Sequence, residues 1–90
     1  KVDIAVIGCS ALDGEGDMLD YDIQEVGVSR ALIAQARKAW LVADHSKLNR
    51  SAPARIASLE VLDTVFTDRA LPPALQTRCA QWQTRIITAE

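Results

Sequence analysis

Two short apolar runs constrain the fold of this chain most, because each is continuous and each ends in polar residues. The first run covers residues 4–7 and stops at Gly8. The second reads Ala39-Trp40-Leu41-Val42, and from Asp44 to Arg50 it gives way to acid, imidazole, hydroxyl, ammonium, amide and guanidinium groups. Continuous apolar runs of this length are typical of strands that are covered on both faces, as in parallel sheets. The sequence therefore predicts an α/β fold with strands over 2–8 and 40–43.

A helix is predicted between these strands, over Ile23–Lys38. Asp22 is a suitable N-cap, and Glu25 lies three residues further on, as in a capping box. Residues at i, i+4 spacing predict the apolar face, which consists of Val28, Leu32, Ala36 and Ala39 and is widened by Ala31. The expected solvent face carries Arg30, Arg37 and Lys38.

The remaining elements complete an alternating order of strands and helices. Before the helix we expect an irregular, acidic and glycine-rich loop over Cys9–Asp22. After the second strand we expect a short extended piece or turn (54–59), a helical turn (58–61), a strand (63–68), a helix opened by Pro72-Pro73 with Leu71, Leu75, Cys79 and Trp82 on one face, and a last strand (85–88). This order is typical of βαβ units and of parallel sheets with crossover connections.

Length and composition limit the class of protein. Ninety residues are enough for one small domain, residues 1–90, and the net charge of −2 argues against this segment gripping nucleic acid. No apolar run approaches the roughly 20 residues of a membrane span. Cys9 and Cys79 lack metal-type spacing, so buried free thiols in a reducing, cytoplasmic compartment are favoured over a disulfide. A chain that begins at Lys1 and enters a strand at once is expected to be a fragment of a longer protein.

Polar residues follow three of the predicted strands. Because the carboxyl ends of parallel strands meet at one edge, these residues are expected to line one pocket. The three strand ends carry Gly8-Cys9-Ser10, Asp44-His45-Ser46-Lys47 and Thr67-Asp68. Carboxylates accept hydrogen bonds from hydroxyl groups, and Lys47 can pair with a phosphate. The sequence therefore favours a small polyol or a phosphorylated sugar as the ligand.

Each of these residues also has a purely structural interpretation. The stretch after the second strand is also typical of a polar turn, with Lys47 on the surface, and Asp68 suits the N-cap of a following turn. His45 is the only histidine, which disfavours a metal site, and the glycines do not match the dinucleotide fingerprint. A Cys9–His45 nucleophilic pair lacks an evident orienting group. The sequence indicates no cofactor and no metal.

At these residues the sequence resembles the C-terminal effector-binding domain of the DeoR family of bacterial transcription regulators. Ile4–Gly8 with Ser10 and Leu12 resembles the family's first strand and turn. The segment Val42–Leu48 is similar to its A-D-x-S-K-F signature, and 54–59 followed by 63–68 resembles its strand ending in I-T-D. The family often has glycine at the position of Ala11 and an aromatic residue at the position of Leu48.

The resemblance implies a three-layer, Rossmann-like fold similar to ribose-5-phosphate isomerase and the CoA transferases. It implies a sugar-phosphate effector site, and the residues that would line it by position are Gly8, Ser10, Asp44, Ser46, Lys47 and Asp68, with Glu25 as a further candidate. It also implies a homo-oligomeric regulator, expected to be a repressor of carbohydrate metabolism. DNA would be bound through an N-terminal winged helix-turn-helix outside these ninety residues, and no membrane would be involved.

Two rival functions stay open at this point. One is an enzyme, an isomerase acting on a pentose phosphate, which would need a base placed against a sugar carbon. The acidic and glycine-rich Asp13–Asp17 does not match the pattern expected for such an enzyme. The other rival is a pure oligomerisation domain. A sensor domain without catalysis is the leading hypothesis.

Overall fold

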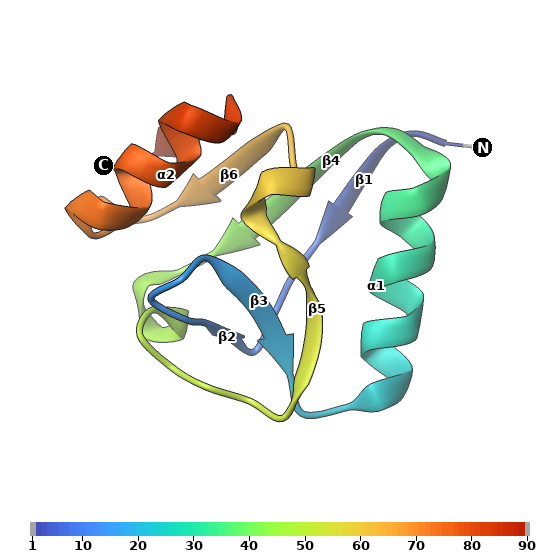
Figure 1. Cartoon of the computed structure of the whole chain (residues 1–90). Helices are drawn as coiled ribbons and strands as arrows, with labels where there is room; N and C mark the ends of the chain where they lie inside the picture. Colours follow the sequence, from blue (N-terminus) through green and yellow to red (C-terminus); the bar gives the residue numbers. More distant parts are fainter. Residues whose placement is uncertain (1, 90) are drawn as a thin grey trace.

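A parallel sheet of four strands forms the centre of the molecule, together with a small antiparallel sheet and two α-helices (Figure 1). The computed structural model describes residues 2–89. The elements in chain order are β1 (Val2–Ile7), β2 (Ala11–Leu12), β3 (Asp17–Asp20), α1 (Ile23–Gln35), β4 (Ala36–Ala43), the 3₁₀ turn η1 (His45–Lys47), β5 (Ala54–Ser58), the 3₁₀ turn η2 (Leu59–Val61), β6 (Thr64–Thr67), α2 (Pro73–Trp82) and β7 (Arg85–Thr88).

The strand order β1-β4-β6-β7 confirms the predicted α/β class. All three pairings are parallel, and the register places Ile7 beside Leu41 and Val65 beside both Leu41 and Ile86. Parallel neighbours need long crossover connections. Here β2, β3 and α1 connect β1 to β4, the segment with η1, β5 and η2 connects β4 to β6, and α2 connects β6 to β7.

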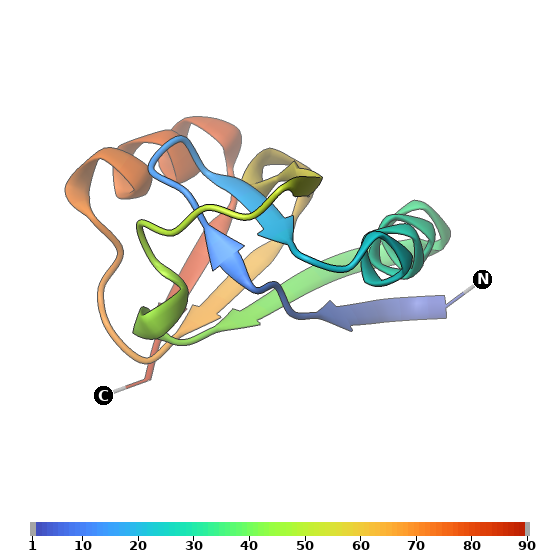
Figure 2. The ribbon, with the colours of Figure 1, turned by 90° about the horizontal axis from the view of Figure 1, so that it is seen from below.

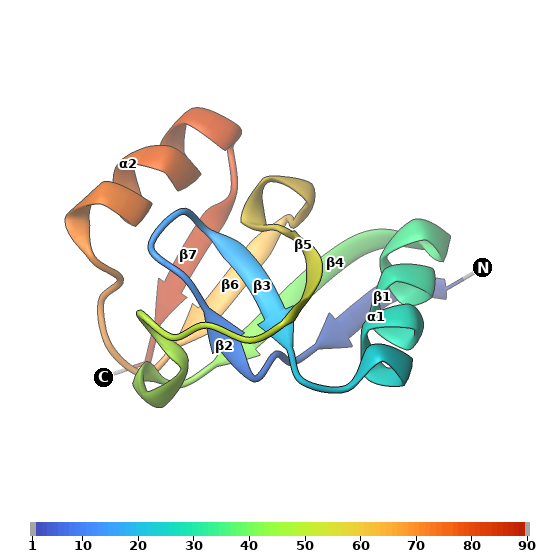
Figure 3. The ribbon, with the colours of Figure 1, turned by 60° about the horizontal axis from the view of Figure 1, so that its bottom comes forward.

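The small sheet, in the order β2-β3-β5, lies over the parallel sheet on the same side as both helices (Figures 2 and 3). The core fills the space between them, and its fully buried aliphatic residues include Leu41, Val65, Leu12, Ile56 and Leu59. Of the three layers that the sequence led us to expect, residues 2–89 supply the parallel sheet and the cover on one of its faces.

The predicted helix over Ile23–Lys38 is wrong at its C-terminal end, because α1 stops at Gln35. Ala36 pairs with Val2, so that Arg37 and Lys38 belong to β4 and do not extend the helix. Their residue types tolerate a helix well, but the parallel pairing with β1 outweighs this local preference.

The predicted apolar face of α1 is also wrong. Val28 is 57% exposed and Leu32 is 37% exposed, whereas Val26 is the buried residue of the helix. The reason is that α1 packs against β5 as well as against the parallel sheet, which turns a different face inward. Arg30 takes part in this contact, since its guanidinium donates to the carbonyl oxygens of Ile56 at 3.0 Å and Arg55 at 2.6 Å.

The expected irregular loop over Cys9–Asp22 contains a β-hairpin instead. Met18 and Leu19 of β3 are buried, and acidic residues on both sides of them had hidden this short apolar pair. Gly16 in the hairpin turn has a φ of +90°, and its carbonyl oxygen accepts a hydrogen bond of 2.8 Å from the amide of Leu59.

The other predicted elements are confirmed. The piece over 54–59 is a strand, the helical turn is η2, and α2 buries Leu75 and Cys79 on the predicted face. Both cysteines are free and buried, as expected. Among residues 2–89, neither helix has the length and apolar character needed to cross a membrane.

The hairpin turn generates a prediction about stability. Replacing Gly16 with alanine should destabilise the fold by about 1–3 kcal/mol, because a side chain is strained at this φ and its Cβ would lie 3.3 Å from the Trp82 ring. The matched control is Gly14→Ala, whose Cβ would lie 3.9 Å from the nearest atom, Asn49 Oδ1. Urea denaturation should show the loss for the first variant alone. Equal stability of the two variants would contradict this account of the turn.

Candidate functional site

The ends of β1, β4 and β6 meet at one edge of the parallel sheet, as the sequence predicted (Figures 1 and 3). These three strands are adjacent and parallel, so the residues that follow Ile7, Ala43 and Thr67 leave the sheet in the same direction. In open α/β sheets this carboxyl edge is the usual place for a ligand.

Asp44 and Ser46 are hydrogen-bonded to each other within the turn after β4. The Asp44 carboxylate accepts hydrogen bonds from the backbone amide of Ser46, at 2.9 Å, and from the Ser46 hydroxyl. These two bonds, with the nearby charge of Lys47, lower the pKa of Asp44. Asp44 is thus the N-cap of η1. Both side chains are exposed at the edge of the sheet, and they are hydrogen-bonded to each other.

Asp68 connects the end of β6 to the end of β4 through His45. Its carboxylate accepts from the backbone amide of His45 at 2.8 Å and from His45 Nδ1 at 2.6 Å. The bond from the imidazole is the main cause that lowers the pKa of Asp68. The sequence suggested His45 only as a metal ligand or as a base, and this pairing was not predicted. The signal was available, because Asp68 and His45 follow neighbouring strands at similar positions.

Lys47 is a half-buried, positively charged residue at this edge. Its backbone amide donates to the Asp44 carbonyl oxygen at 3.1 Å, and Leu48 after it forms an isolated bridge with Leu12 of β2. The Lys47 charge is a lesser cause that lowers the pKa of both Asp44, at the end of β4, and Cys9, at the end of β1. Within residues 2–89 the ammonium has no hydrogen-bond or ion-pair partner.

The seven predicted site residues do not share one cavity. Gly8, Ser10 and Glu25 line an open groove of about 420 Å³ between the end of β1 and α1, together with Cys9 and Asp20. Asp44 and Asp68 line a separate recess of about 220 Å³ with Val42, Phe66 and Thr67. Ser46 and Lys47 of η1 line neither of these two hollows, so a single ligand site formed by the seven residues stays a prediction.

Cys9 and His45 do not form a reactive pair. Burial, with the added negative charge of Asp20, raises the pKa of the Cys9 thiol to about 11, so the thiol stays protonated near neutral pH. Asp68 orients the His45 imidazole through Nδ1, but no hydrogen bond joins His45 to the Cys9 thiol within residues 2–89. Residues 2–89 also contain no group of three or more histidine, cysteine, aspartate or glutamate side chains arranged to hold a metal ion.

The chain is similar to known proteins that are named as regulators of gene expression. A family model described as the DeoR C-terminal sensor domain matches residues 1–69. The chain is 45% identical over 67 residues to a glycerol-3-phosphate regulon repressor of Haemophilus influenzae, covering 74% of this chain and 26% of the relative. It is 33% identical over 87 residues to the transcriptional repressor CsqR of Escherichia coli, covering 97% of this chain and 33% of the relative. An L-fucose operon activator of H. influenzae is 29% identical over 80 residues, covering 89% of this chain and 32% of the relative.

The chain thus spans about a third or less of the length of these curated relatives. All three are named as regulators of gene expression. The family match extends over both the β1 turn and the segment of β4 and η1 that carries Lys47, and it ends just after Asp68. This chain belongs to the DeoR C-terminal sensor domain family.

Proposed function

We propose that this chain is the effector-sensing part of a DNA-binding regulator of carbohydrate metabolism, and that it binds a phosphorylated sugar or polyol at the carboxyl edge of its parallel sheet. The observation that carries the proposal is Lys47, a half-buried cation at the end of β4 whose side chain has no hydrogen-bond or ion-pair partner among residues 2–89. A free ammonium at a strand end attracts an anionic group such as a phosphate.

The neighbouring residues suit the rest of such a ligand. Asp20 and Glu25 in the groove and Asp44 and Asp68 in the recess provide carboxylate oxygens that accept from sugar hydroxyls. The relatives support a ligand of this kind by name, since one regulates a glycerol-3-phosphate regulon and another an L-fucose operon. Glycerol 3-phosphate is therefore the first ligand to test.

The proposed role is sensing without catalysis. The Cys9 thiol is buried and held protonated, so it is not poised as a nucleophile. In this proposal the DNA-binding part lies in the portion of the relatives' length that this chain does not span, and the whole protein is a cytoplasmic homo-oligomer acting as a repressor. Effector and operator affinities would then be coupled reciprocally.

The first prediction concerns Lys47. Replacing it with alanine should weaken binding of glycerol 3-phosphate about tenfold to a hundredfold, because a charge-assisted hydrogen bond contributes about 1.5–3 kcal/mol. Isothermal titration calorimetry measures the affinity, and thermal shifts with triose, pentose and hexose phosphates extend the test. Lys38→Ala, which removes a cation at the opposite end of β4, should bind like the parent chain.

Two controls complete this experiment. Glycerol without phosphate should not bind measurably, and the ligand should be recovered unchanged by ³¹P NMR after incubation. If several phosphates stabilise the parent and the Lys47→Ala variant equally, the assignment of the site is wrong. Conversion of ribose 5-phosphate to an isomer would favour the enzyme in place of the sensor.

The second prediction concerns the two low carboxyl pKa values at this edge. His45→Ala should raise the pKa of Asp68 towards the ordinary aspartate range, because it removes the main hydrogen bond to the carboxylate. Ser46→Ala should do the same for Asp44. Carboxyl ¹³C NMR titration measures both groups, and each variant serves as the control for the other. If either variant raised the pKa of both carboxyl groups, the Asp44–Ser46 and Asp68–His45 pairings would not be independent, which would contradict this interpretation.

The lowered pKa values also fix the direction of the pH dependence. Both carboxylates have a lower pKa in the folded state than in the unfolded chain, so their contribution to stability is present above the unfolded pKa. It is lost as the pH falls through the folded pKa. The Asp68–His45 link between β4 and β6 is therefore expected to weaken in acid, as the Asp68 carboxylate becomes protonated.

A further inference from the structure

A further hollow lies at the carboxyl edge, at the ends of β6 and β7. It has a volume of about 430 Å³ and is lined by Asp68, Arg69, Ala70 and Thr88. Asp68 also lines the recess of about 220 Å³ at the ends of β4 and β6. The two hollows therefore share one residue, and the other three residues of this hollow are not part of the site described above.

Arg69 provides a cation in this hollow. The residue is exposed, and its guanidinium makes no hydrogen bond or ion pair within residues 2–89. Its backbone is held in place, because the hydroxyl of the buried Thr67 donates to the Arg69 carbonyl oxygen at 2.7 Å. The register places Thr88, which also lines the hollow, beside Thr67. A guanidinium and a hydroxyl group are donors that suit an anion.

The strand order separates this hollow from Lys47 along the same edge. Lys47 follows β4, Arg69 follows β6, Thr88 ends β7, and these three strands are adjacent in that order. Neighbouring strands are about 4.8 Å apart, so groups at the ends of β4 and β7 are roughly 10 Å apart. One phosphate is too small to contact both ends of this row. A sugar with an anionic group at each end is long enough to span it.

We propose that the hollow of Arg69 and Thr88 receives a second anionic group of the effector. The effector is then a sugar with a phosphate at Lys47 and another phosphate or a carboxylate at Arg69. This inference rests on the proposed function, because it takes the phosphate at Lys47 as given. The carboxylates of Asp44 and Asp68 follow β4 and β6, where they accept from hydroxyls on the carbons between the two anionic groups. Glycerol 3-phosphate has no second anionic group and fills the Lys47 end alone.

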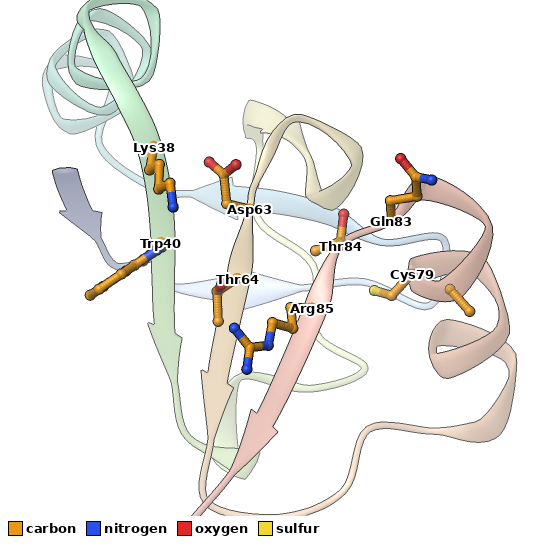
Figure 4. Close-up of a pocket in the computed structure, with 9 residues that line it drawn as sticks. Lys38, Trp40, Asp63, Thr64, Cys79, Gln83, Thr84 and Arg85 are labelled. Carbon is orange, nitrogen blue, oxygen red and sulfur yellow. The ribbon is translucent and has the colours of Figure 1, made fainter. Parts of the chain in front are cut away.

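Two other cations lie at the opposite end of the sheet and provide controls. Lys38 and Arg85 line a groove of about 470 Å³ at the amino ends of β4 and β7, together with Asp63 (Figure 4). Arg85 begins β7 and Thr88 ends it, so the two residues are about 10 Å apart along the strand. Arg85 is therefore the matched arginine for Arg69, since it lies beyond the reach of a ligand at the carboxyl edge.

Paired ligands test the inference on the complete polypeptide that carries these residues. Fructose 1,6-bisphosphate is compared with fructose 6-phosphate, and 6-phosphogluconate with glucose 6-phosphate, by isothermal titration calorimetry. In at least one pair, the ligand with two anionic groups should bind about tenfold to a hundredfold more tightly than its monophosphate. The first pair offers a second phosphate and the second pair a carboxylate, so the comparison also tells which group the hollow prefers.

Variants then assign the preference to the hollow. Arg69→Ala should abolish it and leave the affinity for the monophosphate unchanged. Arg69→Lys, which keeps the charge, should retain part of it, and Arg85→Ala should retain it fully. Lys47→Ala should weaken both members of each pair. Pyrophosphate carries its charge on two directly linked phosphoryl groups that cannot span the edge, and it should bind at least tenfold more weakly than the preferred ligand.

The outcomes separate this inference from the proposed function. If Lys47→Ala weakens binding of glycerol 3-phosphate but neither pair shows a preference, the second anionic group is wrong and the proposed function stands. A preference that survives in Arg69→Ala, is lost equally in Arg85→Ala, or is matched by pyrophosphate would also overturn the inference alone. Absence of binding by every one of these phosphates, glycerol 3-phosphate included, would contradict the proposed function and this inference together.

Discussion

The parallel pairing of β1, β4 and β6 is the constraint on which the rest of this structure depends. It places three chemically different strand ends at one edge, and it forces every connection between the strands to cross over the sheet. The crossing segments carry the small sheet, α1 and α2 and bury the core on one side. The same pairing decides where β4 begins, since its contact with β1 takes Ala36 and Lys38 away from the helix. The candidate site is therefore a consequence of topology before it is a consequence of any single residue.

The strands were predictable because their apolar runs are continuous and end at glycine or at polar residues. The edge itself was predictable for the same reason. The hairpin of β2 and β3 was hidden, because its apolar residues occur as isolated pairs between acids and glycines. The inward face of α1 was also hidden, because Val28 and Leu32 suit a buried face by spacing but are exposed in residues 2–89. Helical periodicity shows which residues share a face, but not which face another element will cover.

The arrangement of the site residues was also predictable only in part. Topology placed Asp44, Lys47 and Asp68 at the same edge, but it did not predict which side chains pair with one another. Asp44 is bonded to Ser46 and Asp68 to His45, so Lys47 is the one of these three residues whose side chain has no partner within residues 2–89. The edge residues also line two separate hollows, which no spacing in the sequence reveals. The edge thus carries one half-buried cation and several carboxylates, which suits a ligand with a phosphate at one end and hydroxyls along its length.

The central claim is that this carboxyl edge, and no other surface of the chain, receives a phosphorylated ligand. Amide chemical-shift mapping during a titration with glycerol 3-phosphate tests it most directly. The account predicts saturable shifts at Gly8, Ser10 and residues 45–48, with a smaller change at Asp68. Shifts confined to the opposite end of the sheet, around Lys38 and Arg85, would contradict the account, and so would the absence of any shift at the carboxyl edge.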